Sequence, residues 1–151
     1  MLARFRQSMD KRDEGFTLIE LLVVMIIIGI LAAIAIPVFL NQRKKGVDTA
    51  AKADVSTLGK EVATYYVDNT AIPVVSIPAA GATAGRYTVN SVDVGRPSSG
   101  VSAPVISFPG VTSGSENGTN WCVQVTVTGG TLTNMQYSAA NGLKTGACPT
   151  S

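Results

Sequence analysis

Two features of this sequence have residue types and spacing that could do chemistry: a lone carboxylate inside an apolar run, and a pair of cysteines. The chain contains no histidine, which removes the commonest general base and metal ligand. Its 2 cysteines cannot supply the four ligands of a structural zinc site. We therefore predict no catalytic residue, no metal site and no bound cofactor, and a structural protein rather than an enzyme.

The carboxylate belongs to Glu20, the one charged residue between Phe16 and Leu40. A helix over that run would cross the roughly 30 Å hydrocarbon core of a bilayer at about 1.5 Å per residue. A carboxylate in such a segment costs about 2.5–3.5 kcal/mol, so it requires a partner or a nearby polar boundary. Either Glu20 reaches back to the headgroups near Gly15, or it pairs with a positive group.

The string from Gly15 to Leu22, Gly-Phe-Thr-Leu-Ile-Glu-Leu-Leu, closely resembles the processing site and helix start of type IV prepilins and their pseudopilin relatives. The resemblance covers residues 1 to about 66. It implies that a prepilin peptidase cuts after Gly15 on the cytoplasmic side and methylates the new amino terminus at Phe16. It also implies that Glu20 neutralises the amino group of Phe16 on a neighbouring subunit. Such a pair would set the register as the helices bundle, because an unpaired charge penalises every other register.

Two other interpretations of the apolar run are a secretory signal peptide and a plain single-span anchor. Ala33-Ile34-Ala35 offers a small-residue cleavage pattern behind a basic leader. The apolar stretch before that pattern is longer than the usual 7–15 residues, and it contains Glu20. A plain anchor explains the length but not the string around Glu20, whereas a prepilin explains both. A mature chain beginning at Phe16, Ile36 or Met1 would distinguish the prepilin, the signal peptide and the anchor.

Beyond the membrane segment the helix is predicted to continue with one apolar face. A single α-helix from Phe16 to about Tyr66 would be roughly 77 Å long, so its second half must project into a soluble domain. Two helices broken near Asn41–Gly46 are the alternative. The residues expected on the buried face recur at steps of four and three: Val47, Ala51, Val55, Leu58, Val62 and Tyr65.

Gly29 and Pro37 also fit the family pattern, and they are the weak points of this helix. Proline removes its own N–H and clashes with the carbonyl four residues earlier, and glycine has a helix propensity about 1 kcal/mol lower than alanine. Filaments of the family are thought to melt such a segment to extend under load. We expect melting between Gly29 and Pro37 in the filament, the alternative being an ordinary kink.

The remainder of the chain reads as a small β-rich head. Residues 70–86 contain two prolines and several glycines and indicate a long loop. Strands are predicted at Tyr87–Val94, at Val101–Phe108 as an edge because of Pro104, at Trp121–Thr128 and at Thr131–Tyr137. Gly129-Gly130 would be a two-residue hairpin turn between the last two strands.

The predicted fold class is α+β. It consists of a long N-terminal α-helix, transmembrane in its first half and amphipathic in its second, packed on a small antiparallel β-sheet. Cys122 and Cys148 would bound a C-terminal segment by a disulfide, the favoured state in an exported domain with a small core; two unpaired thiols are the alternative. Four segments follow: a removed cytoplasmic leader (1–15), a hydrophobic transmembrane or filament-core helix (16–40), an amphipathic continuation (41–67) and an exported head (68–151).

The resemblance implies a single-pass precursor in the cytoplasmic membrane and, after assembly, an extracellular helical filament of many copies. Its partners would be the prepilin peptidase, the pilus assembly platform and minor pilins. A major pilin is the leading interpretation, and a minor pilin or a pseudopilin of a type II secretion or DNA-uptake machine is the alternative; a secreted or membrane-anchored binding module is the third. The residues do not choose among adhesion, twitching motility, DNA uptake and secretion. Net charge is only +2, so DNA binding by scattered basic residues is conceivable but unsupported.

Overall fold

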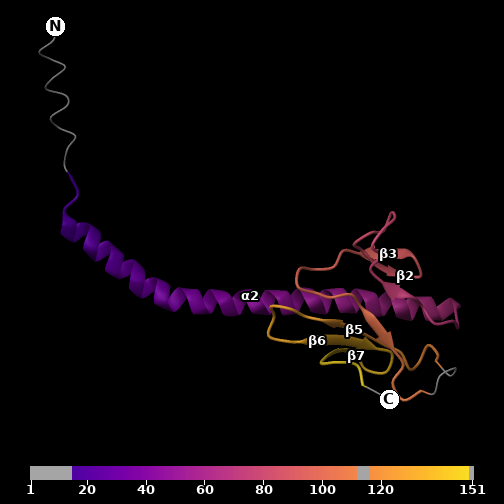
Figure 1. Cartoon of the computed structure of the whole chain (residues 1–151). Helices are drawn as coiled ribbons and strands as arrows, with labels where there is room; N and C mark the ends of the chain where they lie inside the picture. Colours follow the sequence, from indigo (N-terminus) through magenta and orange to yellow (C-terminus); the bar gives the residue numbers. More distant parts are fainter. Residues whose placement is uncertain (1–14, 112–115, 150–151) are drawn as a thin grey trace, which may run out of the picture. The chain divides into compact units, whose positions relative to one another are not determined.

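The long helix predicted at the start of the chain is present and continuous. In the computed structural model, which describes residues 15–111 and 116–149, helix α2 (Leu18–Asp68) spans 51 residues (Figure 1). Its ends lie about two residues later than predicted. The backbone remains helical through Asn41–Gly46, so the alternative of two helices broken there is wrong. The chain divides into two compact units, Met1–Leu40 and Asn41–Ser151, and α2 contributes to both.

The first unit presents an apolar helix with no protein cover. Every side chain from Phe16 to Leu40 is exposed except the half-buried Ala32. Among the described residues, α2 is the one helix that is long and apolar enough to cross a membrane. Its surface is of the kind that lipid or other protein covers, because soluble monomers rarely expose apolar patches larger than a few hundred Å².

The second unit buries the predicted stripe of α2. Four of its residues are completely buried: Ala51, Val55, Leu58 and Val62. They pack in one cluster with residues of both sheets. The aromatic residue of α2 that packs against this cluster is Tyr66 rather than the predicted Tyr65. Tyr65 instead packs edge-on against the Tyr66 ring, with the ring centroids 5.6 Å apart.

The head contains two antiparallel sheets rather than one. The first has the order β1-β2-β3 and the second has the order β4-β5-β6-β7. Figure 1 shows both beside the second half of α2. The bounds of the strands are β1 Val75–Ser76, β2 Tyr87–Val89, β3 Val92–Gly95, β4 Val105–Ser107, β5 Cys122–Thr126, β6 Asn134–Ser138 and β7 Gly142–Thr145.

Two strands were predicted wrongly, and β1 and β7 were not predicted. The segment Tyr87–Val94 is a hairpin, because Asn90 and Ser91 both adopt positive φ (48° and 69°) and turn the chain between Val89 and Val92. Positive φ at both central residues defines a type I′ turn. Such turns usually contain glycine, and these two positions do not. In the segment Val101–Phe108 only β4 is a strand; it lies at the sheet edge as predicted, directly after Pro104.

Strand β5 follows the predicted alternation closely. Trp121, Val123, Val125 and Val127 are all buried in the core. Between them lie Gln124, which is half-buried, and Thr126, which is exposed, whereas Cys122 departs from the alternation because it is buried in the disulfide. The helical stripe and these side chains together form the centre of the head, as expected for an apolar face that pairs with an apolar face.

The connection after β5 differs from prediction. The sequence predicts a two-residue turn at Gly129-Gly130, but the loop is longer. The hydrogen bond that closes it joins the N–H of Val127 to the carbonyl of Thr133 at 2.8 Å. A side chain at position 130 would collide with the carboxylate of Asp48 on α2. Gly130 therefore allows this loop to approach the helix closely.

Two aspartates of α2 hold loops of the head in place. Buried Asp48 accepts hydrogen bonds from the N–H groups of Thr131 (3.0 Å) and Leu132 (3.1 Å) and from the Thr131 hydroxyl. Asp54 accepts from the N–H (2.7 Å) and hydroxyl (2.9 Å) of Ser98 and from the hydroxyl of Tyr87 (3.2 Å). Bonds from backbone N–H groups to a carboxylate are charge-assisted and strong. These contacts therefore hold the helix against the loop at Thr131 and Leu132 and against Ser98 and Tyr87.

Candidate assembly region and disulfide

Glu20 closes the first turn of α2 together with Thr17. The backbone N–H of Thr17 (2.9 Å) and its hydroxyl (2.7 Å) both donate to Oε2 of Glu20. In return, the N–H of Glu20 donates to the Thr17 hydroxyl oxygen at 3.3 Å. This reciprocal pattern is a capping box, which satisfies donors at the helix start that have no partner inside the helix.

Sequence reasoning missed Thr17, although a signal for it was present. Thr-Leu-Ile-Glu is a Thr-x-x-Glu string directly before a long apolar run, which is the sequence signature of a capping box. The structure therefore gives Glu20 a partner within its own chain. Among the described residues both of its side-chain bonds use Oε2, and no bond joins Glu20 to Phe16.

The predicted cleavage residues lie just ahead of this cap. Phe16 is 88% exposed, and Gly15 has no atom near the place where a side chain would begin. The leader residues 1–14 lie outside the described part of the chain. Gly15 and Phe16 are thus accessible in the same stretch that carries Glu20.

Gly29 and Pro37 lie inside α2, and the helix continues through both. A side chain at position 29 would meet no neighbouring atom. Melting in a filament remains a prediction, because this structure holds a single copy of the chain.

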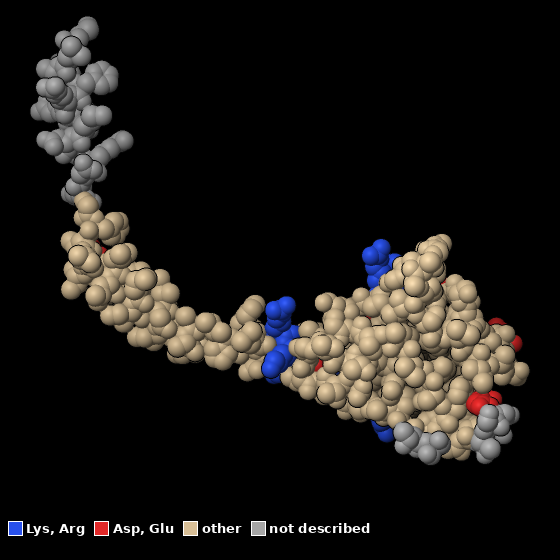
Figure 2. Space-filling model, viewed as in Figure 1, with Lys and Arg blue, Asp and Glu red and all other residues tan. Residues whose placement is uncertain are grey.

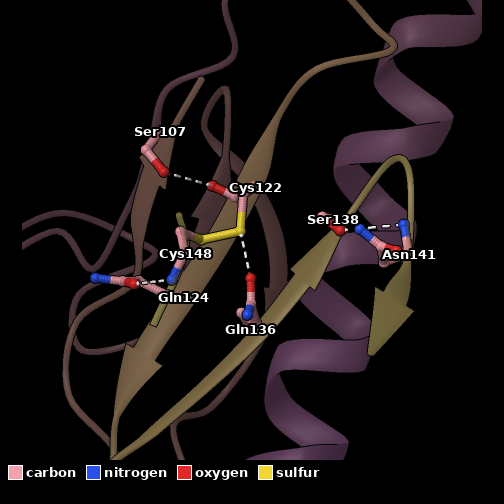
Figure 3. The surroundings of a disulfide bond; sticks show 7 residues. All are labelled: Ser107, Cys122, Gln124, Gln136, Ser138, Asn141 and Cys148. Atoms are coloured by element: carbon pink, nitrogen blue, oxygen red, sulfur yellow. Dashed lines mark hydrogen bonds between the residues drawn. A yellow bond between two sulfur atoms is a disulfide. The ribbon is translucent and has the colours of Figure 1, made fainter. Parts of the chain in front are cut away.

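The predicted disulfide is confirmed. Cys122, at the start of β5, is bonded to Cys148 in the C-terminal tail, with the Cα atoms 5.9 Å apart and both residues buried (Figure 3). The N–H of Cys148 donates to Oε1 of Gln124 at 2.7 Å, which fixes the tail across β5. The Gln136 side-chain amide contacts the sulfur of Cys122 at 3.0 Å. Two residues of β5, Cys122 and Gln124, thereby hold the tail.

Charged and thiol groups of the described residues do not gather into a metal site: no group of three or more such ligands lies together in residues 15–111 and 116–149. The one ion pair there joins Arg86 to Asp93 at 2.5 Å. Hydrogen bonding to Arg86 is the main cause that lowers the pKa of Asp93 below its ordinary value.

The comparisons with known proteins agree with the start of α2. Residues 10–36 match the family model of the prokaryotic N-terminal methylation motif. Over 59 residues the chain is 46% identical to the type IV wide pilus major component PilA4 of Thermus thermophilus, covering 39% of this chain and 45% of that protein. Over 49 residues it is 49% identical to the type IV major pilin protein PilA of Myxococcus xanthus, covering 32% and 22%.

A second group of similar proteins belongs to secretion systems. The chain is 38% identical over 63 residues to the type II secretion system core protein G of Pseudomonas aeruginosa, covering 42% of this chain and 44% of that protein. The chain spans less than half the length of each of these relatives. No solved structure matches it. The methylation motif and these similarities all lie in the first part of the chain, which is therefore similar to the N-terminal part of type IV pilins and of type II secretion pseudopilins.

Proposed function

We propose that the chain is a structural subunit of a type IV pilus, made as a prepilin and polymerised through its N-terminal helix. A prepilin peptidase would cut between Gly15 and Phe16 and methylate Phe16. The subunit would wait in the cytoplasmic membrane as a single-pass protein. The assembly platform and minor pilins would then transfer it into a surface filament.

The observation that carries this proposal is the exposed apolar segment from Phe16 to Leu40. Lipid covers such a surface before assembly, and only other apolar surfaces replace lipid without a large cost. Parallel copies of the same segment supply that surface. A permanently anchored binding module would need the span but not the processing string that precedes it.

Glu20 has a proposed role in this transfer. Removal of the leader creates a positive amino group at Phe16, next to the positive end of α2. The Thr17 contacts fix the Glu20 side chain at the helix start while one carboxylate oxygen, Oε1, is left without a hydrogen bond among the described residues. The amino group of Phe16 on a neighbouring subunit would bind there, at a spacing set by the helix.

Gly29 and Pro37 complete the proposal. In the filament the turns between them would lose helical hydrogen bonds, since Pro37 already lacks one donor. The segment would then lengthen under load. Hydrogen exchange of assembled filaments tests this: fast exchange between positions 29 and 37, against slow exchange on either side, is the expected pattern.

A Gly15→Val variant tests the proposal as a whole. A side chain at position 15 would meet no atom of the described residues, so the substitution should leave the fold unchanged and act on processing. Full-length precursor should accumulate in the membrane, and sheared surface fractions should contain none of the chain. The Gly46→Ala variant is the control, because position 46 is equally open. Uncut Gly15→Val protein in filaments would contradict the proposal.

A pseudopilin of a type II secretion machine is the second candidate, favoured by the similarity to core protein G over 63 residues. A pilin is preferred because identity is higher to PilA4 and PilA, at 46% and 49%. Abundance on sheared filaments distinguishes the two. A major pilin dominates that fraction, whereas a pseudopilin is nearly absent and its loss blocks export of secreted enzymes.

A further inference from the structure

Charge is separated along α2 within the second unit. Arg43, Lys44 and Lys45, here called the basic collar, are all exposed and follow the apolar segment directly. Glu61 and Asp68, here called the acidic end, are exposed near the other end of the helix. Figure 2 shows a cluster of basic side chains where α2 enters the head and acidic ones at the opposite end, with further basic side chains on the upper and lower surfaces of the head.

Lys60 is exposed beside Glu61 in sequence, but neither it nor any other described residue forms an ion pair with the acidic end or the basic collar. Asp48, the acid nearest the collar in sequence, is buried and already accepts bonds from Thr131 and Leu132. The Asp54 carboxylate is likewise occupied by Ser98. Neither acid is therefore available to the collar.

Helix geometry prevents the two groups from meeting within one copy. Arg43 and Glu61 lie on one line along α2, about five turns and roughly 27 Å apart, at 3.6 residues per turn and 1.5 Å per residue. Between two parallel rods, opposite charges at two such points meet when the second rod is shifted by that distance. A shift of this kind joins two different patches, and repetition of such a contact gives an open-ended assembly.

We propose that the basic collar of one copy binds the acidic end of a second copy of this chain, parallel to it and shifted by roughly 27 Å. This contact rests on the proposed function as a filament subunit. The collar directly follows, in sequence, the apolar segment that would pack between copies.

The contact joins different neighbours from the one proposed at Glu20. Phe16 and Glu20 are about one helical turn apart, roughly 6 Å, so a Glu20 partner is shifted by about that distance. The collar contact requires a shift more than four times larger. A subunit therefore touches two neighbours through two separate charge contacts, and each can fail without the other.

Anionic lipid headgroups are the other occupant that fits a basic collar next to a membrane segment. A lipid surface explains only half of the pattern, because its negative charge repels Glu61 and Asp68. A second copy of the chain complements both ends, which is why it is the partner proposed here.

Exchange of charges tests the contact in the full-length chain. One variant carries Arg43→Glu, Lys44→Glu and Lys45→Glu, the second carries Glu61→Lys and Asp68→Lys, and the third combines all five. Each of the first two should lower the amount of chain in sheared filaments about tenfold or more, since several repelling charges replace attracting ones at each contact. The combined variant should restore most of it. Lys144→Glu, an exposed reversal in β7, is the control and should assemble normally.

Leader removal and the level of processed protein in the membrane are measured in every variant to control for insertion and folding. Loss of assembly in the collar variant that the combined variant does not restore, with normal assembly of the acidic-end variant, overturns the contact and assigns the collar to headgroups. Normal assembly of both reversals also overturns it. Wild-type chain that is never cut at Gly15 and never assembles overturns the proposed function itself.

Discussion

Three carboxylates of α2 have three different surroundings, and each surrounding dictates a different role. Glu20 shares a capping box with Thr17 at the exposed helix start. Asp48 is buried and accepts hydrogen bonds from Thr131 and Leu132 in a loop of the head. Asp54 accepts hydrogen bonds from Ser98 and Tyr87. A carboxylate side chain alone therefore does not indicate function; its donors do.

Replacing Glu20 by glutamine separates capping from charge. Glutamine also serves at this position of a capping box, so the Thr17 contact and the helix start are retained while the negative charge is lost. We expect normal removal of the leader but at least about tenfold less chain in sheared filaments. The amino group of Phe16 would then be an unpaired charge in an apolar bundle, which costs about 3–5 kcal/mol. Unchanged amount and order of subunits in Glu20→Gln filaments would show that the charge does not set register.

Asp48→Asn should destabilise the head. Asparagine keeps one oxygen that can accept from the N–H groups of Thr131 and Leu132, but its NH2 group replaces Oδ2, which accepts from the Thr131 hydroxyl and N–H, and the charge that strengthens all of these bonds is lost. We expect the midpoint of thermal unfolding to fall by about 5 °C or more. Asp68→Asn is the control, because Asp68 is exposed and lies away from these loops. An equal midpoint in the two variants would contradict the anchoring role.

The same aspartate makes stability depend on pH. The Thr131 hydroxyl is the main cause that lowers the pKa of Asp48, with the N–H groups of Leu132 and Thr131 and the charge of Lys52 adding to it and burial opposing it. A lowered pKa in the folded state means that the stabilisation is complete above about pH 4, the ordinary value for aspartate, and is lost as the pH falls through the lowered pKa. Between pH 6 and pH 2.5 the midpoint of thermal unfolding should fall more steeply for the wild type than for Asp48→Asn.

At the scale of elements, the closest contact between α2 and the second sheet is made at Gly59. A side chain at this position would overlap the ring of Tyr137 on β6. That ring is itself stacked on Trp121, with centroids 6.1 Å apart and planes 9° apart. The helix therefore lies against the sheet at a distance that only glycine permits.

Gly59→Ala and Gly46→Ala form a matched pair on one helix. Alanine favours a helix over glycine by about 1 kcal/mol, so Gly46→Ala, at an open position, should stabilise the chain slightly. Gly59→Ala must displace Tyr137, and overpacking of this kind costs about 1–3 kcal/mol. Denaturant unfolding of both detergent-solubilised variants measures the difference. Equal stabilisation by both would show that the sheet gives way without cost.

The disulfide fixes the last element of the head. Closing a segment of 26 residues should contribute about 3 kcal/mol to the free energy of unfolding. We expect the Cys122→Ser/Cys148→Ser double variant to lose about that amount and to release the tail from Gln124. Reduced wild-type chain is the control and should behave like the double variant. Identical unfolding of oxidised and reduced wild type would contradict the estimate.

The sequence predicts the helix and the central strand well because each has a strong period. The stripe from Ala51 to Val62 and the alternation from Trp121 to Val127 follow from steps of 3.6 and 2 residues. The hairpin at Asn90-Ser91 and the loop that Asp48 holds were missed. Both depend on backbone geometry and on contacts between residues far apart in sequence, which local patterns do not encode.

The candidate site was predicted unevenly for the same reason. The string around Glu20 located the site, and Cys122 and Cys148 were paired correctly. Thr17 was overlooked although its spacing to Glu20 was visible. The charge separation between Arg43 and Glu61 needed the observation that one continuous helix carries both residues.

At the scale of the whole molecule, the chain combines an apolar helix that lacks protein cover with a head that has a packed core and a pinned tail. The head buries its apolar side chains in its own core, whereas the apolar segment from Phe16 to Leu40 is exposed and, in the proposed function, would be covered first by lipid and later by other copies. In the proposed function, cleavage after Gly15 would connect these two states, since it would remove the charged leader and create the amino group proposed to pair with Glu20.

Mass spectrometry of the mature amino terminus from sheared surface fractions tests this account most directly. The account predicts a chain that begins at Phe16 and carries one methyl group on its α-amino nitrogen. A surface chain that begins at Ile36 would identify an ordinary signal peptide, and one that still begins at Met1 would identify a plain anchor. Either of these results would contradict the account.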